Sequence, residues 1–388
     1  MRFSMISLSA LTAAVLLAAC AQPGGAGSAA TRPAASATAT AAAAVQRQDL
    51  APGLYELAYS ARQNAVFVAA TGGFGDNAEK PRVLRLDPQT LAVQAEIALP
   101  TRGFGVVLDD EAGRLYVGHT VDAAVSVVDI AANRVVSTIK LADKVKSKAP
   151  DGREVERAPH NFRELVLDKA NHRLYLPGLS LAADGALYVV DTQALRLEKV
   201  VPGLGRGATG IALDARGNRL FVSNLMGQIA VVDTVGLVVS RTFDSGGDQP
   251  LNLVYDAPTN RLFAIDQGLA SLQDLRKKDN ADYVARPGNR VLVLDADSGK
   301  SVATLPAGDG PVALTLDAAR QRLYVTNRGS GSVSVFDSTR YQALQTIALP
   351  THPNSLALDT ARNVLYVSVK NGRDAARGSQ ESVARIAF

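Results

Sequence analysis

The stretch that decides the fold is LTLDAARQRLYVTN, residues 314–327, in which one apolar run ends on Asp317 and the next begins at Arg322. The four residues between them suit a tight turn, because an Asp that ends a strand readily hydrogen-bonds its own downstream backbone. We call this Asp, or the residue in its place, the anchor. The pattern recurs along the chain, and such self-similarity predicts a repeat architecture. Full copies stand at Asp109/Arg114, Asp168/Arg173, Asp214/Arg219, Asp256/Arg261 and Asp317/Arg322, and degenerate copies at Ser60/Ala65 and Asp359/Val364.

A second motif, an alternating apolar run that ends on Asp, follows six of the seven copies. Four more residues and another strand-like run come after it, such as RVVSTI at residues 134–139. Each unit therefore has four short strands, here called A to D. Four strands in a period of roughly 40 residues are typical of propeller blades. The Asp residues of the second motif are Asp87, Asp129, Asp191, Asp233, Asp295 and Asp337.

The last copy lacks a D strand, since the chain ends with its C strand at 383–388. We expect the segment near 45–50 to supply the missing strand, because closing the ring with strands from both termini leaves no open sheet edge. The sequence thus predicts an all-β protein, a seven-bladed β-propeller of four-stranded antiparallel blades over residues 45–388. We expect it to be a monomer.

The repeated Asp and Arg are assigned to the fold and not to function. The anchor Asp is expected to cap the turn that follows it. The Arg opens strand B beside that Asp, so the two can form an ion pair.

The N-terminal residues are typical of export. Arg2 precedes an uncharged apolar run at 6–19, and this run ends on LAAC at 17–20, which matches the lipobox of bacterial lipoproteins. We predict a lipoprotein signal peptide at 1–19, lipid modification of Cys20, and a flexible tether rich in Ala, Gly, Ser and Thr at 20–44. An ordinary secretory signal with an incidental Cys is the alternative.

This leader sets the expected location. Ala21 is not an acidic retention signal. We therefore expect a protein on the periplasmic side of the cell envelope, attached by its lipid to the outer membrane.

Composition excludes several functional classes. The formal net charge of +4 is too small to predict binding to nucleic acid or anionic lipid from bulk charge. The four His are scattered, and Cys20 is the only Cys, so the propeller has no thiol nucleophile and no Cys-His metal spacing. We predict no catalytic residue, no metal and no cofactor.

Loop lengths give the two faces of the propeller different roles. Every A–B and C–D turn has four residues, whereas insertions occur at 70–82, 267–290 and 371–382 between strands B and C, and at 142–161 between two blades. In an antiparallel blade these connections emerge on one face. Function concentrates on variable loops held by a rigid scaffold, so that face is the predicted working side.

The A strands line the central channel and begin on the same face. Residues four and five before the anchors form a polar ring there, which suits a small ligand. The alternative is that these residues only hydrate the channel. The predicted ligand-binding residues at the channel mouth are Tyr55, Glu56, Phe104, Arg163, Glu164, Asn252, His352 and Asn354.

The tetrapeptide YVTN at 324–327 names a repeat family of bacterial propellers, and the body from residue 53 resembles the periplasmic YncE-type proteins within it. The resemblance implies a non-enzymatic envelope propeller, associated with single-stranded DNA binding and iron-responsive expression. The chain has no Trp, so a stacking site built on Trp is absent here. The segments that carry the resemblance are 55–60, 104–105, 163–166, 209–210, 350–358 and 365–370.

The inserted loops combine cations with aromatic rings, as single-strand binding requires. The same loops also carry Asp and Glu, so a solvated loop of mixed charge is the alternative. The candidate nucleic-acid-binding residues are Phe74, Lys144, Lys146, Lys148, Arg276, Lys277, Lys278 and Tyr283.

Two rival functions remain open. One is a lactonase-like hydrolase that uses Glu56, Arg163, Glu164 and His352 in the channel. The other is a passive scaffold that binds an envelope protein partner of an outer-membrane uptake system.

Overall fold

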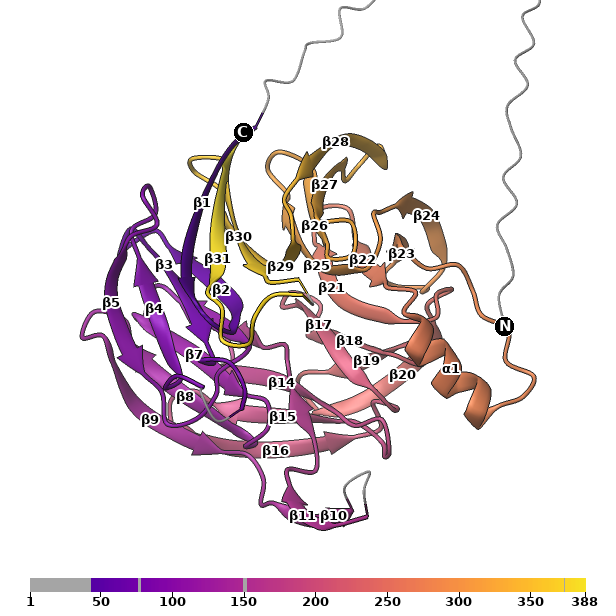
Figure 1. Cartoon of the computed structure of the whole chain (residues 1–388). Helices are drawn as coiled ribbons and strands as arrows, with labels where there is room; N and C mark the ends of the chain where they lie inside the picture. The colour runs from indigo at the N-terminus through magenta and orange to yellow at the C-terminus, as the bar shows by residue number, and fades with distance from the viewer. Residues whose placement is uncertain (1–42, 76–77, 149–151, 373) are drawn as a thin grey trace, which may run out of the picture. The chain divides into compact units, whose positions relative to one another are not determined.

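The computed structural model describes residues 43–75, 78–148, 152–372 and 374–388. The predicted signal peptide, Cys20 and the tether as far as residue 42 lie outside the described residues. Figure 1 shows seven sheets arranged around a central axis, which confirms the predicted seven-bladed β-propeller. All strands within a sheet pair antiparallel, for example β2 with β3 and β30 with β31.

Each of the first three blades runs from strand A to strand D in chain order. Blade one has β2 (Leu54–Ser60), β3 (Ala65–Ala70), β4 (Arg82–Leu86) and β5 (Val93–Ala98). Blade two has β6 (Val106–Asp109), β7 (Arg114–His119), β8 (Ala124–Asp129) and β9 (Arg134–Lys140). Blade three has a broken A strand, β12 (Asn161–Phe162) and β13 (Val166–Asp168), then β14 (Arg173–Leu179), β15 (Ala186–Asp191) and β16 (Arg196–Pro202).

The remaining blades follow the same order until the ring closes. Blade four has β17 (Ala208–Asp214), β18 (Arg219–Asn224), β19 (Gln228–Asp233) and β20 (Val238–Asp244). Blade five has β21 (Pro250–Asp256), β22 (Arg261–Asp266), β23 (Arg290–Asp295) and β24 (Ser301–Pro306). Blade six has β25 (Pro311–Asp317), β26 (Arg322–Asn327), β27 (Ser332–Asp337) and β28 (Gln342–Ala348), and blade seven has β29 (His352–Asp359), β30 (Val364–Lys370), β31 (Glu381–Ala387) and β1 (Ala44–Ala51).

Blade seven closes the ring as predicted. The N-terminal strand β1 pairs antiparallel with β31, from Ala44 opposite Ala387 to Asp49 opposite Ser382. It is therefore the D strand of the last blade (Figure 1). Both edges of the C-terminal strand are paired, so closure covers an edge that would otherwise be open.

The repeat anchors sit where the sequence places them. In every blade the anchor is the last residue of strand A and pairs with the first residue of strand B, as Asp317 does with Arg322. In five of the six Asp anchors the carboxylate accepts a backbone N–H from three residues downstream, for example Asp317 Oδ1 from Arg320 at 3.0 Å, whereas Asp256 accepts the hydroxyl of Thr259. The predicted turn cap is confirmed.

Among the described residues the possible Asp–Arg ion pair of the repeat forms in only one of the five full copies. It forms between Asp214 and Arg219, at 2.8 Å. Strand B lies between A and C, so its first Arg can equally reach outward, and Arg261 pairs with Asp295 at the end of strand C, at 2.8 Å. In blade six an Arg within the turn, Arg320, pairs with the anchor Asp317 instead.

The core lies between successive blades and is built mainly from B and C strands. Tyr116, Tyr175, Tyr324 and Tyr366 occupy the third position of their B strands and are at most 1% exposed. Burying one large apolar side chain contributes roughly 1.5–3 kcal/mol. These rings therefore hold neighbouring blades together and make the channel wall rigid.

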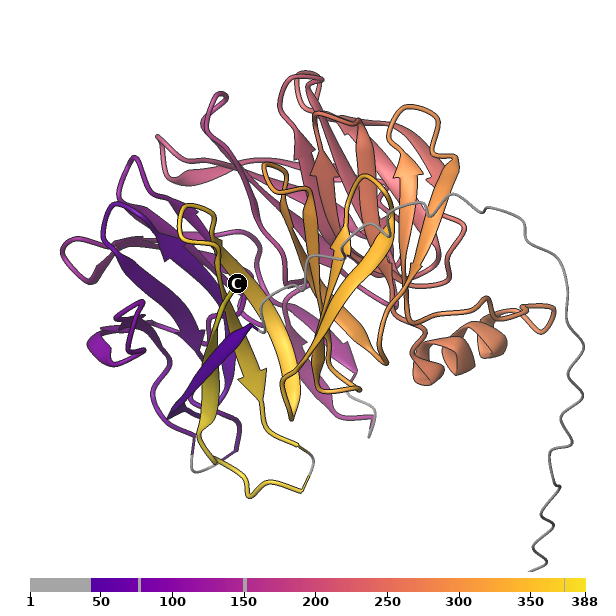
Figure 2. The same ribbon diagram turned by 90° about the horizontal axis from the view of Figure 1, so that it is seen from above.

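The beginning of strand A, the end of B, the beginning of C and the end of D share one face. In blade one Leu54 pairs with Ala70, and Ala70 pairs with Arg82. Insertions between B and C, and between D and the next A, therefore project from that face. Figure 2 shows the helix α1 (Ala270–Asp279) and the yellow loop after β30 on the same side of the propeller.

Two insertions have secondary structure that loop length alone did not predict. Residues 267–290 contain α1, and residues 142–161 contain the hairpin of β10 (Val145–Lys148) and β11 (Glu154–Arg157). The helix has no buried residue, so its sequence lacks the apolar periodicity that marks a packed helix. Among the described residues no helix is long and apolar enough to span a membrane.

Candidate functional site

A cavity of about 210 Å³ opens at the channel mouth, on the face that carries the insertions. Its lining comes from three positions of the repeat, namely four and five residues before the anchor and eleven residues after it. The first two positions lie at the start of strand A, and the third lies at the end of strand B. The lining residues are Tyr55, Glu56, Phe104, Gly105, Thr120, Arg163, Glu164, Leu251, Asn252, Gln267, Val312, Ala313, Arg328, Asn354, Ser355 and Lys370.

Seven of the eight predicted channel-mouth residues line this cavity. The exception is His352, which is not among the lining residues. Its Nδ1 lies 2.7 Å from the carbonyl oxygen of Arg328, so the ring is engaged with the backbone of the neighbouring blade.

Sequence reasoning missed four lining residues, Thr120, Gln267, Arg328 and Lys370. All four stand eleven residues after their anchors, where strand B ends. Because strand B runs antiparallel to strand A, its last residue returns to the height at which A begins. The repeat register itself was the signal that would have found them.

Gly105, four residues before the anchor of blade two, allows the A strands of blades two and three to lie close together. A Cβ on Gly105 would lie 2.2 Å from the carbonyl oxygen of Arg163 in the next blade. Since real Cβ atoms do not approach so closely, a side chain there would push the two A strands apart. Gly105 therefore has a packing role and does not supply a ligand contact.

Glu56 and Glu164 form a carboxyl pair on the cavity wall, from blades one and three. Val106 N–H donates to Glu56 Oε2 at 3.0 Å, and Asn252 Nδ2 donates to Glu164 Oε1 at 2.8 Å. The two carboxyls also lie close enough for the charge of Glu164 to act on Glu56. Burial raises the pKa of both, and that of Glu56, which also faces the charge of Glu164, rises well above its usual range. Both carboxyls are therefore easier to protonate than an ordinary Glu.

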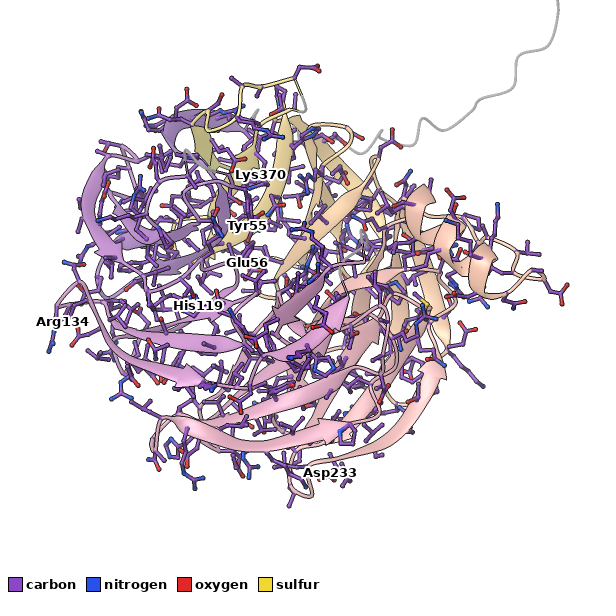
Figure 3. All side chains as sticks on the ribbon, turned by 60° about the horizontal axis from the view of Figure 1, so that its bottom comes forward. Tyr55, Glu56, His119, Arg134, Asp233 and Lys370 are labelled. Atoms are coloured by element: carbon purple, nitrogen blue, oxygen red, sulfur yellow. The ribbon has the colours of Figure 1, made fainter. Side chains whose placement is uncertain are left out.

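Lys370 is a cation of the cavity wall that the fold already uses. Its Nζ lies 2.8 Å from Glu381 Oε2 and 2.6 Å from the carbonyl oxygen of Leu54, and it sits 3.8 Å from the ring centroid of Tyr55. Burial lowers the pKa of Lys370, and the charge of Glu381 opposes that shift. Figure 3 shows Lys370, Tyr55 and Glu56 close to one another inside the ring, with Arg134 at its outer rim.

Arg163 and Arg328 are cations of a different kind. Both side chains are exposed and line the cavity, from blades three and six. Within the described part of the chain neither guanidinium donates a hydrogen bond or forms an ion pair. Their positive charges act on Tyr55, lowering its pKa against the dominant effect of burial, which raises it. The two guanidiniums therefore act on the same aromatic wall.

An aromatic pair completes the wall. Tyr55 and Phe104 meet edge to face, with ring centroids 4.4 Å apart. The cavity thus combines free guanidiniums, a carboxyl pair with raised pKa values and an apolar surface. A few convergent polar groups beside an aromatic wall are typical of sites for small polar molecules.

The predicted nucleic-acid-binding residues are not gathered into one surface. Arg276 pairs with the buried Asp248 at 3.1 Å and stacks on Tyr283 at 4.3 Å, so both residues anchor α1. Lys144 pairs with Asp122 at 3.0 Å. The β10–β11 hairpin follows blade two and α1 belongs to blade five, so their cations arise from separate parts of the rim.

The other candidates for nucleic-acid binding are more accessible. Phe74 is 56% exposed and lies beneath the guanidinium of Arg102, at 5.0 Å. Lys146, Lys277 and Lys278 are exposed. The side chain of Lys148 lies outside the described residues.

Comparisons with known proteins agree with the fold. No protein-family model matches the sequence. The uncharacterized protein YncE of Salmonella typhimurium (strain LT2) is 30% identical over 297 residues, which cover 75% of this chain and 75% of that protein. The uncharacterized protein YncE of Escherichia coli (strain K12) is 32% identical over 307 residues, which cover 72% of this chain and 84% of that protein.

Among solved structures, hydrazine synthase of Kuenenia stuttgartiensis superposes with a TM-score of 0.64 over 85% of this chain and 95% of that chain. At 16% identity this likeness shows the fold alone. The YncE proteins match over most of their length at 30–32% identity, and the seven blades agree with the resemblance seen in the sequence. The chain belongs to the YncE family of β-propellers.

Proposed function

We propose that this protein is a non-enzymatic binding protein of the cell envelope that takes a small polar ligand into its channel-mouth cavity. The observation that carries the proposal is the set of unused hydrogen-bond donors on the cavity wall. Arg163 and Arg328 have no partner among the described residues, although both guanidiniums line the cavity. Each presents five N–H donors in a fixed fork, which suits a ligand oxygen.

The carboxyl pair supports the same proposal. Burying Glu56 beside Glu164 costs stability, because a buried charge loses its hydration. Small apolar residues such as Ala313 fill the equivalent place in blade six. The fold therefore does not need carboxyls at this height of the channel, and a binding role gives a reason for them.

A thermal-shift screen with neutral, cationic and anionic compounds tests the proposal. We expect at least one class to raise the melting temperature of the native protein. The rise should be lost in Ala313→Leu and Ser355→Leu, which fill the cavity, and kept in Ala132→Leu, on an exposed turn. If no compound of any class shows this dependence on the cavity, the proposal is wrong.

The location is part of the proposal and is supported by the sequence LAAC at residues 17–20. A lipid on Cys20 would hold the propeller at the membrane surface, where a ligand entering the envelope first becomes available.

Single-stranded DNA is a second candidate ligand. The exposed Lys146, Lys277 and Lys278 support it, whereas the engagement of Arg276 and Tyr283 with Asp248 reduces the surface left for DNA. Fluorescence anisotropy with a labelled oligonucleotide at low and moderate salt decides the matter. Binding through phosphate contacts weakens steeply with salt, so the absence of salt-sensitive binding at micromolar protein would exclude this candidate.

A hydrolase is favoured by one observation, the raised pKa of two carboxyls in a cavity, since such shifts cluster at catalytic sites. The predicted set loses His352, which does not reach the cavity. Turnover of a lactone panel that disappears in Glu164→Gln would establish this rival, and a silent panel would argue against it.

A further inference from the structure

We infer that the ligand of the channel-mouth cavity is a small hydroxylated carboxylic acid that carries a single negative charge. The inference rests on the proposed function and names its ligand class. It follows from the net charge of the cavity wall, from the groups left without partners, and from the size and aromatic wall of the cavity.

The cavity wall is expected to carry an excess of positive charge. Lys370 is already neutralised by Glu381, at 2.8 Å, with both side chains about nine-tenths buried. Burial raises the pKa of both Glu56 and Glu164, so the pair is expected to carry less than two full negative charges. Arg163 and Arg328 contribute two positive charges with no counter-ion of their own. One anionic group on the ligand would therefore offset this excess, and a second would be repelled by the remaining charge of the carboxyl pair.

A carboxylate is the anion that these two arginines suit best. A guanidinium binds a carboxylate through two parallel hydrogen bonds, which fixes the orientation of the ligand as well as its charge. A phosphate monoester carries close to two negative charges at neutral pH. The second charge would lie near the ionised carboxyl pair, so the single-charged acid is favoured.

Several polar groups of the cavity wall suit a ligand that carries hydroxyls. The side chains of Gln267, Asn354 and Ser355, and the Tyr55 hydroxyl, form no hydrogen bond within the described part of the chain, although all of them line the cavity. Amides and hydroxyls both donate and accept, and so does the hydroxyl of a ligand. A purely hydrocarbon acid would leave these groups without partners after displacing their water, which lowers affinity.

The volume and the aromatic pair limit the ligand's size. At about 210 Å³ the cavity lies below the range of roughly 300–1,000 Å³ that is typical of drug-sized ligands. The edges of Tyr55 and Phe104 offer an apolar surface to a short carbon skeleton. A molecule the size of a single sugar acid meets these limits.

Isothermal titration calorimetry tests the inference. The probes are D-gluconate, D-galacturonate and quinate as hydroxylated monoanions, D-glucose for hydroxyls without charge, hexanoate for charge without hydroxyls, and glucose 6-phosphate for two charges. We expect at least one hydroxylated monoanion to bind, and each of the other three probes to bind roughly tenfold more weakly or worse. Arg163→Gln and Arg328→Gln should each lower its affinity roughly tenfold to a hundredfold, because each removes a charge-assisted hydrogen bond. Arg134→Gln, an exposed Arg at the outer rim, should leave the affinity unchanged.

The charge argument has its own test. The double variant Glu56→Gln with Glu164→Gln keeps the hydrogen-bonding shape of the pair and removes its negative charge. It should shift the preference toward glucose 6-phosphate by tenfold or more relative to the best monoanion. An unchanged preference in a variant with a native circular dichroism spectrum would overturn the charge argument.

The outcomes separate this inference from the proposed function. If a neutral or cationic compound binds in the cavity, blocked by Ala313→Leu, and no hydroxylated monoanion does, the inference is wrong and the proposed function stands. If no compound of any class binds in the cavity, both are wrong.

Discussion

Lys370→Met removes a buried cation from the junction between blades seven and one, and we expect the free energy of unfolding to fall by about 3–5 kcal/mol. Lys370 bonds Glu381 at 2.8 Å and the Leu54 carbonyl at 2.6 Å, and the same Glu381 oxygen accepts the Leu54 N–H at 2.7 Å. The side chains of Lys370 and Glu381 are only 10% and 11% exposed. Met preserves much of the side chain's volume but leaves the Glu381 carboxylate buried without its counter-ion. The cost of burying the Glu381 charge without a counter-ion sets the size of the expected fall in the free energy of unfolding.

A double-mutant cycle separates this effect from lost packing. Adding Glu381→Gln to Lys370→Met removes the uncompensated charge, so the double variant should recover at least about 2 kcal/mol of the loss. Urea unfolding followed by circular dichroism and by tyrosine fluorescence provides the assay, since the chain has ten Tyr and no Trp. Coincident transitions with equal slopes would validate the two-state treatment.

The control is Lys140→Met, because Lys140 forms a pair with Asp143 on the surface, where the side chains are 70% and 86% exposed. Its cost should stay below about 1 kcal/mol. If Lys370→Met costs no more than Lys140→Met, or if Glu381→Gln deepens the loss, the reasoning about the blade junction is refuted.

Three further predictions follow from the structure. Folding raises the pKa of Glu56, so its protonated form contributes stability that is complete below the unfolded pKa of about 4.3 and is lost as pH rises through the folded pKa. The melting temperature of Glu56→Gln should therefore rise relative to that of the native protein as pH increases. Parallel profiles of melting temperature against pH would contradict this. Gly105→Ala should lower the free energy of unfolding by more than about 2 kcal/mol, because the new Cβ would lie 2.2 Å from the Arg163 carbonyl oxygen. The control is Gly236→Ala, whose Cβ would have its closest contact at 3.5 Å and should cost less than about 1 kcal/mol in the same urea assay. Mass spectrometry of the mature protein should find an acylated Cys20 at its N-terminus, and an unmodified N-terminus elsewhere would contradict the predicted anchor.

The fold could be predicted almost completely from the sequence, because the same strand and turn pattern recurs in every blade of a propeller. The anchor Asp needs a tight turn after it in each blade, so its spacing counts the blades and marks the ends of strands A and B. Because each blade needs four strands, the absence of a D strand from the last copy predicted that β1 fills its place. Most blades lack the ion pair between the anchor Asp and the following Arg, because strand B lies between strands A and C. The sequence does not indicate which of the two strands the Arg side chain turns toward, and Arg261 pairs with Asp295 of strand C.

The candidate site was predicted only in part. The residues at the start of strand A were found because strand polarity places them at the channel mouth. Arg328 and Lys370 occupy the same height from strand B and were overlooked, although the register contained them. The contact between Glu56 and Glu164 could not be read from the sequence, because it joins blades one and three across the channel and depends on how tightly the ring closes. The position of His352 outside the cavity lining has a similar cause, since its backbone partner Arg328 lies in a neighbouring blade.

The helix α1 shows where sequence patterns carry no information. It has no fully buried residue, although Leu272 packs against the core, and the contacts of Arg276 and Tyr283 with Asp248 help to hold it in place. These contacts join residues that meet only in the folded protein. Their charges and rings looked like a binding surface in the sequence, whereas in the structure they fix a loop.

The most direct test of the central claim is a crystal structure of the protein with the strongest ligand from the compound screen. We expect its density in the channel-mouth cavity, with a ligand oxygen within hydrogen-bond distance of Arg163 or Arg328. Ligand density on the outer loops or between the blades, with only water in the channel mouth, would contradict the claim that this cavity is the binding site.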